Sequence, residues 1–234
     1  MNQPSLRWVE TRRGLRLLHG RHTVSEVLAQ PGPTHSVFDV LGACAALLAP
    51  GPRVAVLGFA AGGLMAPLRA LGSRARVFGV DLSLQGAQAF ERVSGSWAGA
   101  YDVKREDAAA YLRRQRSPFD LIIEDLSEQI PGDVTKPSVS IEALPELISG
   151  ALAIGGVAVF NVLPVPGLST AAVVRRMAAP FPPGACLISF EEFDNRILIA
   201  GAKLPAPREL SRILKRGLRA IGSRQAERVR LGAL

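Results

Sequence analysis

Cysteine is scarce in this chain of 234 residues, which contains only Cys44 and Cys186. Two cysteines cannot build the disulfide framework of a small secreted protein, and both lie in apolar stretches, where we expect buried thiols. Long hydrophobic runs are also absent. The most apolar stretch, residues 151–163, contains two glycines and is shorter than the about 20 residues of a membrane-spanning helix. Residues 1–13 lack the apolar segment of a secretory signal. We therefore expect a cytoplasmic protein without a transmembrane segment.

Histidine is scarce too, with three residues, all in the N-terminal part of the chain. His19 and His22 could share a site. Neither a cysteine nor an acidic cluster accompanies them, although protein metal sites commonly draw on such ligands. We therefore expect no bound metal.

The net charge of +8 is distributed unevenly. Residues 203–234 contain nine basic and two acidic residues and so carry +7 of that charge. Apolar residues recur at helical spacing over 207–221, with basic residues largely opposite them. This pattern predicts a basic amphipathic helix. The helix either packs on the protein with a solvated basic face or contacts an acidic partner, such as a lipid surface or nucleic acid.

The rest of the chain alternates between short apolar runs and segments with helical spacing. We expect strands at residues 53–57, 75–80, 100–103, 119–123 and 157–162, and two closing strands at residues 187–190 and 196–200. Apolar strands that alternate with helices of about ten residues form sheets with helices on both faces. The sequence therefore predicts an α/β fold with a doubly wound, mostly parallel, seven-stranded sheet.

The N-terminal residues follow a different pattern. Residues 6–28 alternate loosely and contain Arg-Gly and His-Gly turn signals, which predict short β-hairpins. We accordingly divide the chain into an N-terminal hairpin region (1–34), a Rossmann-like domain (35–202) and a basic C-terminal helix and tail (203–234).

Small residues follow the first strand of the predicted sheet, in the segment GFAAGG at 58–63. Such residues let a ligand approach the backbone, but a tight turn between a strand and a helix also needs them for packing alone. The candidate cofactor-binding residues in this turn are Gly58, Ala60, Gly62 and Gly63. The Gly-Lys-Ser/Thr of a phosphate-binding loop is missing.

Acidic residues follow the next two strands. Asp81, with Leu82 beside it, ends the second strand, where a carboxylate can accept hydrogen bonds from both hydroxyls of a ribose. Glu106 and Asp107 follow the third strand, where an acid can accept from the amino group of adenine. The alternative role for Asp81 and for Asp107 is to cap the helix that follows. We retain all four residues as candidates for cofactor binding.

The strongest chemical signal follows the fourth strand, in the segment EDLSEQ. Asp125 is the candidate catalytic residue, because a carboxylate at this edge of the sheet can take a proton from an amine. Glu124 and Glu128 are candidates for binding a cationic substrate. The alternative is a solvated loop or a helix cap.

Several of these segments resemble the spermidine synthases, which are polyamine aminopropyltransferases of the class I S-adenosylmethionine-dependent transferase fold. RVAVLGFAAGG is similar to that family's VLVIGGGDGG, and FDLIIEDLSE is similar to its YDVIIVDSSD. VFGVDLS is similar to its strand that ends in the ribose-binding acid, and ETRRGLRLLHGRHTVSE is similar to its N-terminal hairpin. The resemblance covers roughly residues 10–202. It implies the class I methyltransferase-like Rossmann fold, a ribose on Asp81, a catalytic base at Asp125 and a homodimer.

The chain departs from the family's pattern at the amine-binding positions. Ala61 stands where the family has an aspartate that binds the amine of the aminopropyl group. Asp39 ends the run Val-Phe-Asp in place of the family's Tyr-His/Gln-Glu run, and we retain it as a candidate for substrate binding. Val56 stands where methyltransferases usually carry an acid.

The resemblance favours a transferase that moves an aminopropyl or methyl group to an amine or another small nucleophile. The donor would be S-adenosylmethionine or its decarboxylated form, acting as co-substrate. One alternative is a non-catalytic protein of the same fold that binds an adenosyl ligand or a partner. Another is an NAD-dependent oxidoreductase, because the Gly58-x-Ala60-x-x-Gly63 spacing and Asp81 approximate the dinucleotide fingerprint.

Overall fold

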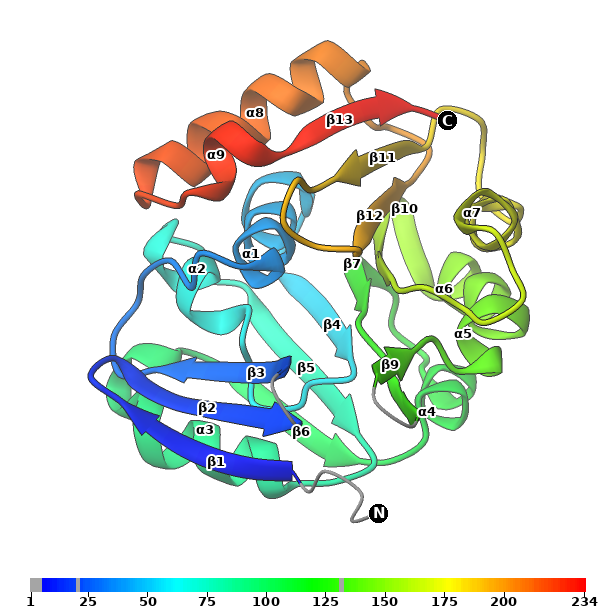
Figure 1. The fold of residues 1–234 in the computed structure, drawn as a ribbon. Helices are drawn as coiled ribbons and strands as arrows, with labels where there is room; N and C mark the ends of the chain where they lie inside the picture. Colours follow the sequence, from blue (N-terminus) through cyan, green and yellow to red (C-terminus); the bar gives the residue numbers. More distant parts are fainter. Residues whose placement is uncertain (1–5, 20–21, 131–132) are drawn as a thin grey trace.

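The centre of the computed structural model is an eight-stranded sheet with the strand order β13-β11-β12-β10-β7-β4-β5-β6 (Figure 1). The structure describes residues 6–19, 22–130 and 133–234. The parallel strands are β4 (Arg53–Leu57), β5 (Arg76–Asp81), β6 (Tyr101–Arg105), β7 (Phe119–Glu124) and β10 (Leu152–Val162). The antiparallel strands are β11 (Cys186–Ser189), β12 (Arg196–Ala200) and β13 (Arg230–Ala233). The predicted α/β class and mostly parallel sheet are confirmed, and β13 adds an eighth strand.

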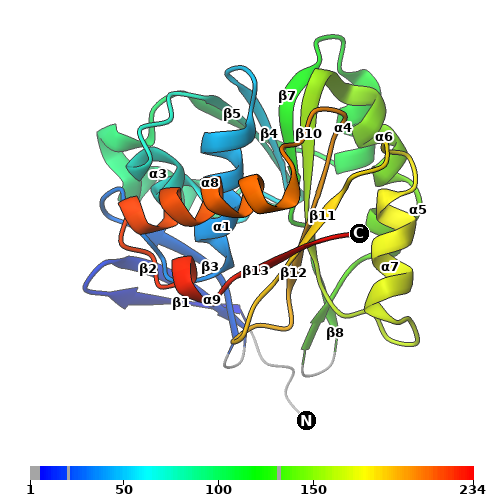
Figure 2. The ribbon, with the colours of Figure 1, turned by 90° about the horizontal axis from the view of Figure 1, so that it is seen from above.

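Helices cover both faces of this sheet, as Figure 2 shows from above. One face packs against α1 (Val37–Leu48), α2 (Met65–Ala70), α3 (Gln85–Ser94) and α8 (Pro207–Ala220). The other packs against α4 (Ala108–Arg114), α5 (Ser138–Glu142), α6 (Leu144–Ala151) and α7 (Thr170–Ala178). The central strands are mostly apolar, because both of their faces are buried, and their sequences therefore contain short hydrophobic runs. None of the helices in the described residues is long and apolar enough to span a membrane.

The N-terminal region forms a separate three-stranded antiparallel sheet of β1 (Leu6–Thr11), β2 (Gly14–His19) and β3 (His22–Leu28). This confirms the predicted hairpins. Strands β2 and β3 of this sheet lie beside α3. The indole nitrogen of Trp97, in the short helix η1 (Gly95–Ala98), donates to the carbonyl of Ala29 at 2.9 Å. A smaller hairpin, β8 (Glu128–Ile130) and β9 (Asp133–Thr135), occupies a segment expected to be a polar loop.

The C-terminal segment packs into the central domain. Helix α8 buries Leu210, Leu214 and Leu218, which lie on the predicted apolar face, and it contacts α1. Beyond it, α9 (Gln225–Arg228) leads into β13, which pairs with β11 at the edge of the sheet. The expected tail after residue 221 is therefore structured.

Candidate active site

A cleft of about 450 Å³ opens at the carboxyl ends of three parallel strands. Ala60 follows β4, Asp125 follows β7, and Asn161 lies near the end of β10. Because β5 and β7 flank β4 on opposite sides, the strand order reverses here, and open α/β sheets bind ligands at such a point. Residues of β2, β3 and β9 supply further walls of the cleft.

Asp125 is the predicted catalytic residue, and it lines this cleft. Its Oδ1 accepts a hydrogen bond from Nδ2 of Asn161 at 2.6 Å, and Oδ1 of Asn161 accepts from Nδ2 of Asn195 at 2.9 Å. Burial raises the pKa of Asp125 to about 6, even though Lys136 and the Asn161 hydrogen bond favour the ionised form. A carboxylate with this pKa is mostly ionised at neutral pH and can still accept a proton there.

The glycine-rich turn reaches the cleft through Ala60, while its glycines pack against the protein itself. A Cβ atom at Gly58 would lie 2.6 Å from the carbonyl oxygen of Asp125, and one at Gly63 would lie 2.8 Å from the ring of Phe38. Gly62 has a φ of +65° and packs against the ring of Phe59. The three glycines are therefore required by the turn and its packing.

Asp81 shapes the same turn from the end of β5. Its Oδ2 accepts from the backbone N–H of Ala60 at 2.7 Å, and its Oδ1 accepts from the N–H of Ser83 at 3.0 Å. An ionised carboxylate has about four acceptor positions, so each oxygen can accept another hydrogen bond. Leu82, beside it, is 69% exposed and offers an apolar surface. Neither side chain is among the residues that line the cleft of Asp125, and their binding of a ribose and a base stays a prediction.

The acids after β6 are engaged within the protein. Glu106 forms an ion pair with Arg114. Asp107 caps α4, accepting from the backbone N–H of Ala110 at 2.8 Å. The capping role considered for Asp107 is therefore present, and neither side chain lines the cleft.

The structure removes Glu124 from the cleft, contrary to the expected role in substrate binding. Its side chain is fully buried and paired with the equally buried Lys136, with 2.8 Å between Oε2 and Nζ. Ser140 also donates to its Oε1, at 2.7 Å. Glu128 is exposed on β8 and is not among the residues that line the cleft. The acidic segment thus contributes Asp125 to the cleft and uses Glu124 for the core.

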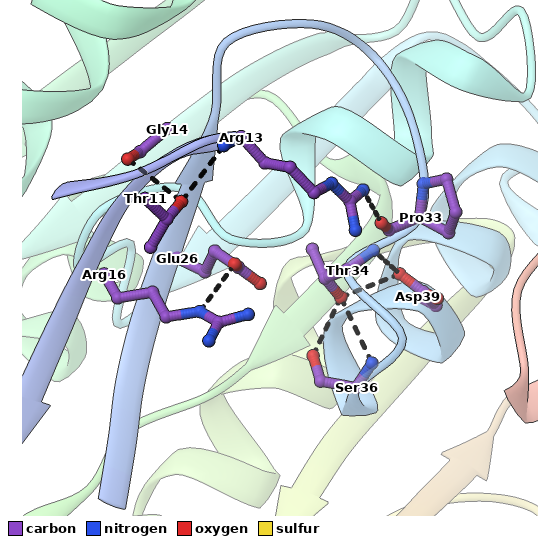
Figure 3. Close-up of polar contacts among 9 residues, drawn as sticks. All are labelled: Thr11, Arg13, Gly14, Arg16, Glu26, Pro33, Thr34, Ser36 and Asp39. Carbon is purple, nitrogen blue, oxygen red and sulfur yellow. Dashed lines mark hydrogen bonds and ion pairs between the residues drawn. The ribbon is translucent and has the colours of Figure 1, made fainter.

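Asp39 is also buried rather than available to a substrate (Figure 3). Its Oδ1 accepts from the N–H of Thr34 at 2.7 Å, and its Oδ2 accepts from the N–H of His35 at 3.0 Å. The hydroxyl of Ser223 donates to Oδ2 as well. The expected substrate-binding role is therefore replaced by a structural one: Asp39 fixes the loop before α1, and Thr34 and Ser36 of that loop line the cleft.

Several polar side chains of the cleft did not enter the sequence prediction, among them Asn195, Arg16 and Glu26. Asn195 immediately precedes β12, and its partner Asn161 is the polar residue at the end of an otherwise apolar strand. Arg16 and Glu26 are direct partners across β2 and β3, so their pairing becomes visible only when the hairpin register is known. Among the described residues, no cluster of three His, Cys, Asp or Glu side chains could hold a metal ion.

Comparison with known proteins identifies the fold. No protein-family model matches the chain, and no curated protein matches it. A probable spermidine synthase from Corynebacterium glutamicum superposes with a TM-score of 0.70 at 15% identity, over 97% of this chain and 87% of that one. Spermidine synthase from Thermotoga maritima superposes with a TM-score of 0.63 at 16% identity, over 92% of this chain and 73% of that one. Human methyltransferase-like protein 13, in complex with SAH, superposes with a TM-score of 0.56 at 21% identity, over 78% of this chain and 90% of that one. The chain has the fold shared by spermidine synthases and S-adenosylmethionine-dependent methyltransferases.

Proposed function

We propose that this protein is a transferase that moves an alkyl group from an S-adenosyl sulfonium donor to an amine or another small nucleophile. The observation that carries the proposal is the placement of Asp125, whose pKa is raised to about 6, in the cleft beside the glycine-rich turn. The fold supports it, since one spermidine synthase of this fold was solved with the transition-state analogue AdoDATO.

The donor supplies an activated carbon, because a sulfonium is a good leaving group. Asp81 would hold the ribose, and Leu82 would pack against the base. Asp125 takes a proton from the nucleophile, whose lone pair then forms the new bond to carbon. The carbon–sulfur bond breaks, its electron pair stays on sulfur, and the donor leaves as a neutral thioether. The protein mainly has to align the nucleophile and accept its proton.

The charges of the cleft favour a small acceptor with a single reacting amine. Among the described residues, Asp125 is the carboxylate of the cleft without an ion-pair partner, since Glu26 is paired with Arg16. A second acidic cluster precedes β12: Glu191 and Glu192 form ion pairs with Arg230 and Arg228, whereas Asp194 forms none among the described residues. An extended polyamine would find few free negative groups here.

Titration calorimetry with S-adenosylmethionine, its decarboxylated form, methylthioadenosine and NAD tests the proposal. We expect the adenosyl ligands to bind and Asp81→Ala to weaken all of them. A transfer assay with small amines should then show turnover that Asp125→Asn abolishes. Binding without turnover would instead identify a non-catalytic binding protein, and binding of NAD alone would indicate an oxidoreductase.

A homodimer, a cytoplasmic location and an acidic partner for the C-terminal segment stay predictions. Four of the nine basic residues of that segment pair with acids of the chain: Arg212, Arg219, Arg228 and Arg230. The remaining five have no ion-pair partner among the described residues, so a basic surface is left for such a contact.

A further inference from the structure

The wall of the cleft formed by β2 and β3 carries an ion pair. Arg16 and Glu26 lie opposite each other in the hairpin, with 2.8 Å between Nε and Oε1. Glu26 is 4% exposed, whereas Arg16 is 44% exposed, and both line the cleft. The buried acid therefore holds the arginine in place while leaving it accessible.

Arg16 keeps most of its binding capacity for a ligand. It contacts Glu26 through Nε, and its guanidinium lies on the side that faces the loop of Thr34 and Ser36 (Figure 3). Its two terminal nitrogens donate no hydrogen bond to any described residue, and Oε2 of Glu26 accepts none from the same part of the chain. Among the described residues, Arg16 is also the one basic side chain that lines the cleft. A guanidinium with two free N–H groups matches a carboxylate.

The pair lines the same cleft as Ala60 of the glycine-rich turn. Oγ of Ser25, next to Glu26, accepts from the backbone N–H of Ala61 at 3.2 Å, which fixes β3 against the turn. Ala61 is the fully buried residue at the position where the aminopropyltransferases that the chain resembles carry an amine-binding aspartate. An acid and a base from the hairpin therefore share the cleft with Ala60, the residue that precedes Ala61 in this turn.

We propose that Arg16 and Glu26 bind an α-amino-acid group, with its carboxylate on the terminal nitrogens of Arg16 and its ammonium on Oε2 of Glu26. This inference rests on the proposed function. The pair shares its cleft with Ala60 of the glycine-rich turn, and this favours the amino-acid end of the donor as the source. The chain would then select S-adenosylmethionine over its decarboxylated form, and the transferred group would be methyl rather than aminopropyl. The same site could instead bind the α-amino-acid group of an acceptor substrate.

The test asks how much more tightly the protein binds a ligand with a carboxylate than the same ligand without it. This difference is measured in the full wild-type chain and in Arg16→Gln. Calorimetry measures S-adenosylmethionine, decarboxylated S-adenosylmethionine and methylthioadenosine, and then ornithine and putrescine in the presence of methylthioadenosine. We expect the wild type to bind S-adenosylmethionine about tenfold to a hundredfold more tightly than the decarboxylated form. Arg16→Gln should remove that preference and leave methylthioadenosine binding unchanged. Arg12→Gln, an exposed arginine outside this cleft, is the matched control.

The outcomes separate the inference from the proposed function. A preference for ornithine over putrescine that depends on Arg16, without a preference between the donors, supports the amino-acid site and assigns it to the acceptor. Another outcome is that methylthioadenosine binds, while neither the two donors nor ornithine and putrescine differ in affinity in a way that depends on Arg16. That result overturns the inference, and the transferase proposal stands. If no adenosyl ligand binds, the proposed function fails, and the donor site fails with it.

Discussion

Nζ of Lys136 lies 2.8 Å from Oε2 of Glu124, and both side chains are completely buried. Lys136 also donates to the carbonyl of Leu126 at 2.6 Å, and Ser140 at the start of α5 donates to Glu124. The pair therefore ties the segment that follows Asp125 to the next helix. This connection fixes the backbone on both sides of Asp125, the candidate base.

Removing the lysine should strongly destabilise the fold. Lys136→Met leaves the buried carboxylate of Glu124 without a counter-ion, and we expect the free energy of unfolding to fall by about 3–5 kcal/mol. Urea denaturation measures this loss. Adding Glu124→Gln to the same chain should restore most of it, because no charge then remains to be compensated. As a control, Arg212→Gln breaks an exposed pair and should leave the free energy of unfolding nearly unchanged. A similarly small change in Lys136→Met would contradict the prediction.

The transfer rate should rise with pH through the pKa of Asp125, which is about 6. Below that pH the carboxyl is protonated and cannot accept a proton, so kcat/KM falls. Asn161→Ala removes a hydrogen bond to the ionised form and should move the midpoint of the profile upward. Asp125→Asn should lower the rate by about 10²–10⁴-fold at neutral pH, and by less below about pH 6, where the wild-type carboxyl is itself protonated. A midpoint near 4, or one unchanged in Asn161→Ala, would show that another group controls the profile.

The parallel sheet and the position of Asp125 could be predicted from local pattern. The central strands are mostly apolar, and parallel strands end at one edge of the sheet, so the residues that follow them converge there. The roles of Glu124 and Asp39 could not be predicted in this way, because they depend on how the chain folds back: Lys136 returns to Glu124 after the β8–β9 hairpin, and Ser223 reaches Asp39 from the C-terminal segment.

The C-terminal strand was missed for a different reason. β13 is a short strand at the edge of the sheet, and it is largely exposed. It therefore lacks the apolar alternation that marks a half-buried strand. Its pairing with β11 gives it structure, and such pairing leaves no signal in its own residues.

The raised pKa of Asp125 also predicts how stability depends on pH. A folded-state pKa of about 6, above the ordinary value of 3.8, means that the folded chain binds the proton more tightly than the unfolded chain. This residue therefore lowers stability as the pH rises from about 4 to about 6. Asp125→Asn keeps an acceptor for Asn161 but cannot ionise. The melting temperature of Asp125→Asn minus that of the wild type should therefore increase from about pH 4 to about pH 6. Above about pH 6 this difference should stay constant. A difference independent of pH would contradict the raised pKa.

The last prediction separates the two reasons for glycine at the turn. Gly58 has a φ of +87°, and a Cβ atom there would lie 2.6 Å from the carbonyl oxygen of Asp125. Gly72 has a similar φ of +78°, but a Cβ atom there would meet nothing within 4 Å. Gly72→Ala should therefore cost only the backbone strain, about 1–2 kcal/mol. Gly58→Ala should cost about 1–3 kcal/mol more, because the backbone at Asp125 must shift. Equal losses in urea denaturation would mean that the turn tolerates the extra atom. A larger loss for Gly58→Ala, with weaker turnover of the folded fraction, would show that this glycine sets the position of the candidate base.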